Sequence, residues 1–292
     1  MTRAFVIAAI PLLCLWAHAE TSAWAVSDPH ANKIFLLGTS HVLRASDYPL
    51  PGAFDSAYEA AETIVLEAPM DAMKQPDIQM KLLQATLLQG TTVQDALTAE
   101  SYRQLKAYCH GKGIPLMALQ QLKPGMLCMT LTIMEMQALG LSLEGVDAHY
   151  LAQAKADNKQ VEALESIEFA IGMIADFGEG EEDELVQSTV EDLATLKEEF
   201  PKVIAAWRKG DLKALDELLM VDMRKKFPKL YKRLLTERNS AWLPKLEAYL
   251  ESPAVEAVFV GVGHMVGEAG LLAMLRAKGY TVRPFTAETQ ED

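Results

Sequence analysis

Short apolar runs alternate along this chain with longer segments in which apolar residues recur at helical spacing. Runs of four to six residues that are rich in Val, Ile, Leu and Phe and bounded by turn residues are typical of buried strands. The predicted strands are Trp24–Ser27, Ile34–Leu37, Thr63–Leu66, Gln160–Leu164, Val255–Val260 and Tyr280–Pro284, with Ile114–Leu119 as a further candidate.

Between these runs the pattern predicts helices. Thr92 and Asp95 form a capping-box pattern that marks one helix start. Residues 167–250 are predicted to be helical, with breaks at Gly178–Gly180, Pro201, Gly210 and Pro228. The other predicted helices are Phe54–Glu62, Tyr102–His110, Met126–Leu139, Asp147–Ala156 and Met265–Lys278. We interpret the methionines of Met126–Leu139 as core-filling side chains.

Strands that alternate with helices predict an α/β fold, with a mainly parallel central sheet flanked by helices. We expect the helical stretch at about residues 166–250 to be an insertion or cap before a C-terminal βαβ unit. Half of the chain is hydrophobic and 23% is charged, which is enough apolar sequence for a sizeable core. No low-complexity linker interrupts residues 20–292, so we expect one domain.

The N-terminal segment predicts export. Arg3 precedes the apolar run Ala4–Trp16, and Ala17-His18-Ala19 forms an A-x-A site with cleavage expected after Ala19. Residues 1–19 therefore read as a signal peptide, and the protein is expected to be periplasmic or secreted. The alternative is an uncleaved anchor, although the run is short for a membrane span. No later segment predicts a span in the mature chain.

The charge balance restricts the partners. The formal net charge is −13, which disfavours nucleic acids and anionic membranes as ligands. The basic stretch from Arg224 to Arg233 has the spacing of a solvated helix face. Two cysteines follow the leader, Cys109 and Cys128, and either a disulfide or two buried thiols is compatible with their positions.

Two strand ends carry the same local pattern. Gly38-Thr39-Ser40-His41 follows the strand at Ile34–Leu37, and Gly261-Val262-Gly263-His264 follows the strand at Val255–Val260. Glycine lets the backbone bend sharply, and ligands of open α/β sheets bind beyond the carboxyl ends of the strands. A single histidine in this position is commonly structural. Two in the same setting favour a shared site.

Two acids end other strands of the predicted sheet, Glu67 and Glu165. Together with His41 and His264 they would converge at one edge. Such a set can hold a transition metal with an open coordination position, or act as a general acid–base pair. A dinucleotide site at Gly261, Gly263 and Gly267 is disfavoured, because only about 25 residues follow and an exported protein is a poor place for a diffusible nicotinamide.

The chain resembles the TraB/GumN family, which includes the Tiki proteins, over nearly all of its mature length. The matching stretches include both Gly-x-x-His segments and the strand-end acid, and the C-terminal block is the strongest. They are Trp24–Ser27, Phe35–Val42, Tyr48–Pro51, Phe54–Tyr58, Val65–Glu67, Gly145–Asp147, Leu164–Glu165, Arg238–Asn239, Gly261–Glu268, Gly270–Leu272 and Gly279–Val282.

The resemblance implies a fold related to the Tiki proteins, the erythromycin-esterase-like enzymes and the haem-binding ChaN-like proteins. It implies that His41, Glu67 and His264 bind a divalent metal such as Mn, Co or Zn, and that Arg238 faces the same site. Glu165 and Glu268 also match family positions, without a clear role. Gly125 and Ser166 depart from the usual Trp and Thr of the family.

The leading hypothesis is therefore a periplasmic or secreted metal-dependent hydrolase that cleaves peptide bonds. His41 and His264 would be ligands, Glu67 a ligand or general base, and Arg238 would stabilise developing negative charge. A metal-free variant uses a histidine as base in ester hydrolysis. The rivals are a haem-binding or metal-binding protein of the ChaN-like type, and an inactive scaffold in envelope assembly.

Overall fold

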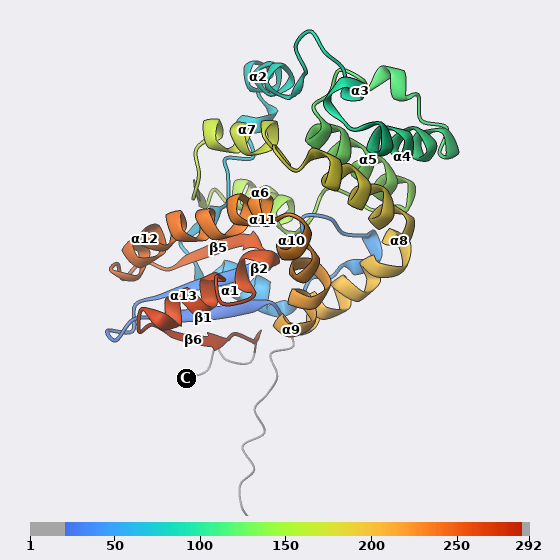
Figure 1. Ribbon diagram of the computed structural model, residues 1–292. Helices are drawn as coiled ribbons and strands as arrows, with labels where there is room; N and C mark the ends of the chain where they lie inside the picture. Colours follow the sequence, from blue (N-terminus) through green and yellow to red (C-terminus); the bar gives the residue numbers. More distant parts are fainter. Residues whose placement is uncertain (1–20, 288–292) are drawn as a thin grey trace, which may run out of the picture.

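A six-stranded sheet forms the centre of the computed structural model, which describes residues 21–287 (Figure 1). The strand order is β4-β3-β5-β2-β1-β6. The strands are β1 (Ala23–Ser27), β2 (Lys33–Thr39), β3 (Thr63–Leu66), β4 (Gln160–Ala163), β5 (Glu256–Gly261) and β6 (Thr281–Pro284). The predicted signal peptide and its cleavage site after Ala19 lie outside the described residues.

Four neighbouring strands, β4, β3, β5 and β2, run parallel, whereas β1 pairs antiparallel with both β2 and β6. Thr39 at the end of β2 pairs with Gly261 at the end of β5, and Leu66 at the end of β3 pairs with Phe259. The carboxyl ends of the parallel strands therefore meet along one edge. The fold class predicted from the sequence is confirmed.

Thirteen α-helices accompany the sheet within residues 21–287. They are α1 (Gly52–Ala60), α2 (Pro76–Thr86), α3 (Val93–Ala96), α4 (Ala99–Gly111), α5 (Pro124–Ala138), α6 (Val146–Ala156), α7 (Ile167–Ala175), α8 (Glu182–Lys209), α9 (Leu212–Leu215), α10 (Val221–Lys226), α11 (Pro228–Tyr231), α12 (Arg238–Leu250) and α13 (Leu271–Ala277). Two π-helical turns, η4 (Asp216–Met220) and η5 (Lys232–Glu237), and a 3₁₀ turn, η6 (Val262–Met265), lie near the carboxyl edge of the sheet.

Alternate residues of each strand face two different cores. Phe35 and Phe259 pack on one face against α1, α6 and the buried Trp207 of α8. Leu36 and Val258 pack on the other face against α12 and α13. Because both faces are covered, the central strands are apolar at nearly every position.

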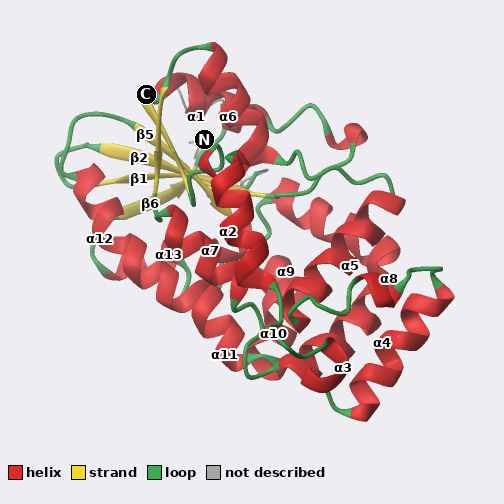
Figure 2. Ribbon diagram, turned by 90° about the horizontal axis from the view of Figure 1, so that it is seen from above, coloured by secondary structure: helices red, strands yellow, loops and turns green. Residues whose placement is uncertain are grey.

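A third core forms away from the sheet, between α3, α4, α5 and α8 (Figure 2). These helices include residues 93–138, so the helical part of the molecule is larger than the predicted insertion at about 166–250. None of the helices within residues 21–287 has both the length and the apolarity to cross a bilayer.

Three sequence predictions of elements are wrong. Leu116–Ala118 forms a 3₁₀ turn rather than a strand, because Ile114 N bonds back to Cys109 O to close α4 and Pro115 has no N–H to donate. The last predicted helix begins only at Leu271, because η6 and the left-handed Gly267 (φ 75°) come first. Pro201 lies within α8 without a break, and buried neighbours such as Ile204 hold the helix in place.

The methionines of α5 are not fully buried, contrary to the prediction that they fill the core, although Met136 packs against the core below it. Met126, Met129 and Met136 are half-buried, and Met134 is 39% exposed. Leu127 and Leu131 of α5 fill the core instead. The half-buried and exposed methionines therefore leave apolar surface partly open on α5, among the helices that lie away from the sheet.

Cys109 and Cys128 are both buried and both free, so the structure has two thiols rather than a disulfide. Burial raises the pKa of Cys128 to about 11, which keeps the thiol protonated and unreactive. The basic stretch pairs with nearby carboxylates: Arg224 forms a double contact of 2.7 Å to Asp216, and Arg233 lies 3.4 Å from Asp176. Its interpretation as a helix surface is consistent with these contacts.

Candidate functional site

Five charged or polar side chains meet at the carboxyl edge of the sheet. His41 follows β2, Glu67 follows β3, Glu165 follows β4 and His264 lies in η6 after β5. Glu165 N donates to Glu67 O at 2.9 Å, which extends the β3–β4 ladder by one residue and places both acids at the same level. Arg238, the first residue of α12, reaches this edge from a helix and not from a strand end.

Glu67 lies at the centre of the cluster. Its Oε1 accepts a hydrogen bond from Gly261 N at 2.6 Å and lies 3.8 Å from His41 Nε2 and 3.9 Å from His264 Nε2. Its Oε2 accepts from Arg238 Nη2 at 2.6 Å. Burial opposes ionisation, but His264, His41, Arg238 and the Gly261 amide together lower the pKa of Glu67 to about 2. Glu67 is therefore a carboxylate at neutral pH.

Arg238 connects the two acids to His264. Its Nε and Nη2 donate to Glu165 at 2.6 and 2.9 Å, and its Nη1 lies 3.2 Å from His264 Nε2. The guanidinium also stacks over the ring of Trp242, whose Nε1 donates to Glu165 at 2.9 Å. Burial lowers the pKa of Arg238, but the two carboxylates outweigh this effect and raise it. A π-helical turn, η5, directly precedes Arg238, and such turns are frequent at functional sites.

His264 is held in one tautomer. Asn239 Nδ2 donates to the carbonyls of His264 and Ala269, so Asn239 Oδ1 faces His264 Nδ1 at 2.6 Å and requires a proton on it. His264 Nε2 is then the acceptor for Arg238 and carries its lone pair into the site. Burial lowers the pKa of His264 to about 4, so the ring is neutral. At 4% exposure, His264 is buried, packed against Asn239 and Trp242 of α12.

His41 contrasts with His264. Its side chain is 60% exposed, and its Nδ1 lies 2.7 Å from Oδ2 of the buried Asp147. Asp147 Oδ1 accepts from Thr39 Oγ1 at 3.0 Å, which fixes the carboxylate. The charge of Asp147 raises the pKa of His41 to about 9. His41 Nε2 is left to face Glu67 from the open side of the site.

Glycine at position 261 keeps a space open between these groups. A Cβ there would lie 3.0 Å from His41 Nε2 and 3.3 Å from Glu67 Oε1. Gly38, the other glycine singled out in the sequence, has a different role, because its Cβ would meet Val262 Cγ2 at 2.9 Å. Gly38 thus lets β2 pack closely against η6, and Gly261 leaves room for a small species beside the carboxylate.

A family model matches residues 22–284, a range that contains every residue of this cluster. The chain belongs to the TraB/PrgY/gumN family. No curated protein and no solved structure matches the chain at a significant level. The geometry of this TraB/PrgY/gumN protein must therefore be interpreted from its own residues.

The donor atoms of this TraB/PrgY/gumN site suit a divalent ion. A tetrahedral ion bound to nitrogen and oxygen at its usual distances separates the ligand atoms by about 3.4 Å. The two Nε2 atoms lie within about half an ångström of that separation from Glu67 Oε1. Asp147 and Asn239 orient the two imidazoles through Nδ1, as partners of metal-bound histidines do.

Two features show how far this arrangement is from a closed metal centre. Within residues 21–287, no group of three or more His, Cys, Asp or Glu side chains is placed so that it could hold a metal ion as it stands. His264 Nε2 is also already engaged, because it accepts a hydrogen bond from Arg238 Nη1. The residues fit a divalent ion if the imidazoles shift by a small distance, His41 releases the Nε2 proton that its raised pKa retains, and His264 exchanges its contact with Arg238 for the metal.

The structure thus brings His41, Glu67, Glu165, Arg238 and His264 together. Glu268 is not part of this cluster. It is exposed in the loop before α13, and among the described residues it makes no hydrogen bond to the cluster. Sequence reasoning assigned no role to Asp147, Asn239 or Trp242. The first two lie in stretches of family resemblance, Gly145–Asp147 and Arg238–Asn239, and that resemblance was the available signal.

Proposed function

We propose that this protein is a metal-dependent hydrolase, periplasmic or secreted, that cleaves peptide bonds. One observation carries the proposal: Glu67 Oε1 lies nearly equidistant from the Nε2 atoms of His41 and His264, beside the space that Gly261 leaves open. The family resemblance to the Tiki proteins supports the peptide bond as the target.

Three side chains would hold the ion, which we take to be Mn, Co or Zn. They are His41 and His264 through Nε2 and Glu67 through Oε1. Both imidazoles have Nδ1 committed to a fixed partner, so each presents Nε2 to the site. A bound divalent ion would polarise the scissile carbonyl and lower the pKa of a bound water.

The chain itself supplies the remaining chemistry. Arg238 stays positively charged and is held in place by Glu165 and Trp242. Its Nη1 group would be free to donate a hydrogen bond to an oxyanion once His264 gives up its contact with that group. The exposed side chain of His41 marks the side from which a substrate would enter, because the side chains of His264 and Arg238 are nearly buried. Glu165 shares the charge of Arg238 with Glu67, whose Oε1 faces the two imidazoles.

Metal analysis of the purified protein, followed by a screen of fluorogenic peptides with added Mn²⁺, Co²⁺ or Zn²⁺, tests the proposal. We expect cleavage that a chelator abolishes and that Glu67→Gln eliminates. Glu268→Gln is the matched control, since this exposed acid lies outside the cluster, and it should retain full activity. Cleavage that survives both the chelator and Glu67→Gln would exclude the proposed site. A strong visible absorption band from bound haem, without peptidase activity, would favour the haem-binding rival.

A further inference from the structure

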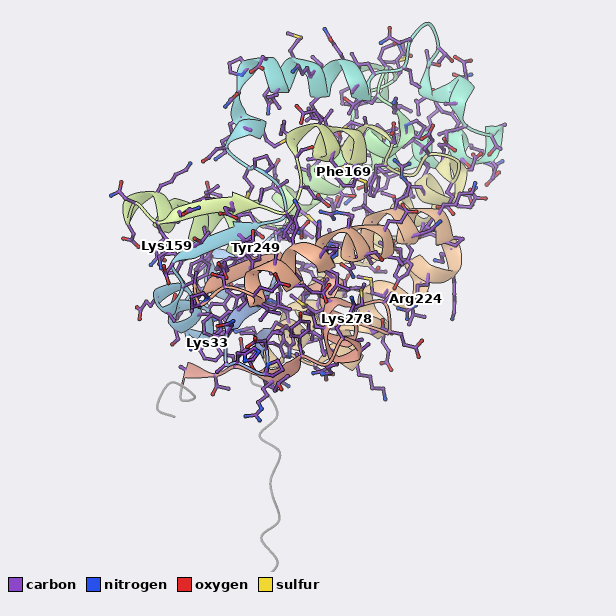
Figure 3. The ribbon with its side chains drawn as sticks, turned by 90° about the vertical axis from the view of Figure 1, so that its left-hand side faces the viewer. Lys33, Lys159, Phe169, Arg224, Tyr249 and Lys278 are labelled. Carbon is purple, nitrogen blue, oxygen red and sulfur yellow. The ribbon has the colours of Figure 1, made fainter. Side chains whose placement is uncertain are left out.

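Helix α7 begins two residues after Glu165 and is unusual in its exposure. Seven of its nine residues are apolar, yet the buried positions are two alanines, Ala170 and Ala175. All five large apolar side chains stay half-buried or exposed: Ile167, Phe169, Ile171, Met173 and Ile174. Phe169 is 45% exposed and stands out from α7 above the strands (Figure 3). An apolar helix that leaves its large side chains partly open is typical of an interaction surface.

Residues at helical spacing form one partly exposed stripe along α7, a helix that also packs beside α2. We call Phe169, Gly172 and Met173 the α7 stripe, since positions i, i+3 and i+4 share a face of a helix. Glu165, which holds Arg238, precedes this stripe by one turn, and Asp176 follows it. The stripe therefore leads from the candidate site to the far end of α7.

Gly172 is the least expected member of the stripe. Glycine inside a helix is unfavourable relative to alanine. No packing partner explains it, because a Cβ at Gly172 would have no heavy atom within 4 Å, and its φ is not positive. The glycine leaves bare backbone facing open space, which favours the close approach of another chain.

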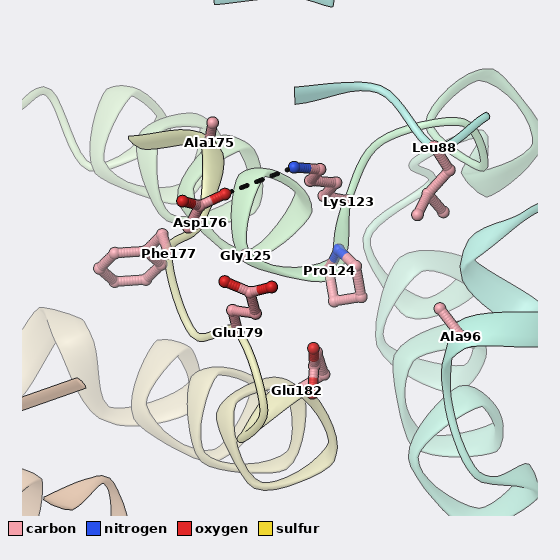
Figure 4. A pocket seen from close by; sticks show the side chains of 10 residues that line it. All are labelled: Leu88, Ala96, Lys123, Pro124, Gly125, Ala175, Asp176, Phe177, Glu179 and Glu182. Atoms are coloured by element: carbon pink, nitrogen blue, oxygen red, sulfur yellow. Dashed lines mark ion pairs between the residues drawn. The ribbon is translucent and has the colours of Figure 1, made fainter. Parts of the chain in front are cut away.

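A cavity of about 160 Å³ lies at the far end of α7 (Figure 4). Pro124 and Phe177 give it apolar walls, and its charged lining contains Lys123, Asp176, Glu179 and Glu182. Lys123 and Asp176 pair with each other at 3.6 Å, and Glu179 lies 3.6 Å from Arg233. Glu182 has no cation at ion-pair distance among the described residues. The cavity thus has a spare carboxylate for a positively charged group.

We propose that the α7 stripe and this cavity form the substrate-binding path of the hydrolase, and that its substrate is an extended peptide with apolar residues followed by a basic one. The inference rests on the proposed function for the bond that is cut. Apolar side chains would lie against Phe169 and Met173, with the peptide backbone over Gly172. The basic side chain would enter the cavity and pair with Glu182. The acidic lining repels anionic lipid headgroups and therefore favours a peptide.

The length of α7 sets the spacing of the substrate. Nine helical residues span about 13 Å, and an extended peptide covers about 3.3 Å per residue. The basic residue therefore lies about four residues from the scissile bond. This spacing distinguishes the proposal from a general preference for hydrophobic peptides.

Binding is tested separately from cleavage, with chelator present to prevent turnover. The probes are two fluorescein-labelled ten-residue peptides, each with four apolar residues, followed by arginine in one and by glutamate in the other. We expect the arginine peptide to bind about threefold to tenfold more tightly by fluorescence anisotropy. Glu182→Gln should reduce this preference, because it removes the spare carboxylate.

Gly172→Leu is the variant that tests the proposed peptide path most directly. We expect the melting temperature to stay the same or rise, because a helix former replaces glycine in open space, while peptide affinity falls at least about tenfold. Gly111→Leu is the control: it ends α4, also has open space at Cβ, and should leave affinity unchanged. Unchanged affinity in Gly172→Leu, or a change in vesicle binding or self-association in place of peptide binding, would overturn the inference.

The two proposals fail in different ways. Peptides that bind with these preferences but are not cut when metal is added would contradict the hydrolase and leave the peptide path intact. Peptides that are cut at equal rates by Gly172→Leu and the unmodified protein, without preference for arginine, would contradict the path and leave the hydrolase intact.

Discussion

Removal of the two proposed imidazole ligands should affect stability very differently, although both changes should abolish hydrolysis. His264 is buried, donates to Asn239 Oδ1 and accepts from Arg238. His264→Ala leaves that buried amide oxygen without its donor and the guanidinium without one acceptor. It also removes the ring that stacks on Trp242 at 4.4 Å.

The magnitudes follow from these contacts. A buried polar group that loses its partner costs about 1–3 kcal/mol, and the loss of ring packing adds to it. We expect His264→Ala to lower the free energy of unfolding by about 2–4 kcal/mol. His41 is largely exposed, and Asp147 keeps its hydrogen bond from Thr39 when the imidazole is removed, although the buried carboxylate loses its cationic partner. We expect His41→Ala to lower the free energy of unfolding by about 1–2 kcal/mol, less than His264→Ala does.

Urea unfolding at one pH, with hydrolysis measured on the same preparations, checks this contrast. The slope of the unfolding transition should be unchanged, so that a shift in its midpoint reports stability alone. Glu268→Ala serves as the exposed control and should match the unmodified protein in both measurements. Equal destabilisation by His41→Ala and His264→Ala would refute the assigned burial, and activity in either variant would refute its role as a ligand.

Two further changes test other parts of the structure. Gly261→Ala should fold, because the backbone at this position (φ −49°, ψ 134°) suits alanine. The alanine methyl group would fill the space beside His41 and Glu67. Calorimetric titration with Zn²⁺ should therefore show at least about tenfold weaker binding than in the unmodified protein. Burial, with Glu162 nearby, raises the pKa of Glu256 from 4.5 to about 7, so the folded protein binds this proton more tightly than the unfolded chain and loses stability as pH rises from 4.5 to 7. Glu256→Gln should raise the free energy of unfolding at pH 8 by up to about 3 kcal/mol and change it little at pH 4.5, as urea unfolding at both values would show; equal stability at pH 8 would contradict this.

The strands and their carboxyl edge could be predicted because the sequence signal is local. Val258, Phe259 and Val260 read as a buried strand in any context, and the glycine and histidine that follow mark its end. The elements that failed depend on non-local partners. Ile114–Leu119 has strand composition but no strand beside it to pair with, and its first amide closes α4 instead.

The same distinction applies to the site. His41, Glu67 and His264 could be proposed because each follows a strand of one sheet. Asp147 and Asn239 could not be assigned a role, since each acts through a hydrogen bond to a histidine that is distant in sequence. The burial of His264 could not be predicted either, because it depends on Asn239 and Trp242 of α12, which are distant from residue 264 in sequence.

The proposed hydrolysis requires metal binding by the two histidines and the strand-end acid. Titration of the metal-free protein with Co²⁺, followed by visible absorption and by peptide cleavage in the same samples, tests it. We predict one equivalent of Co²⁺ per chain, cleavage that rises in proportion to the metal bound, and loss of both in Glu67→Gln. Cleavage without bound metal, or the same Co²⁺ spectrum and affinity in Glu67→Gln, would contradict the account.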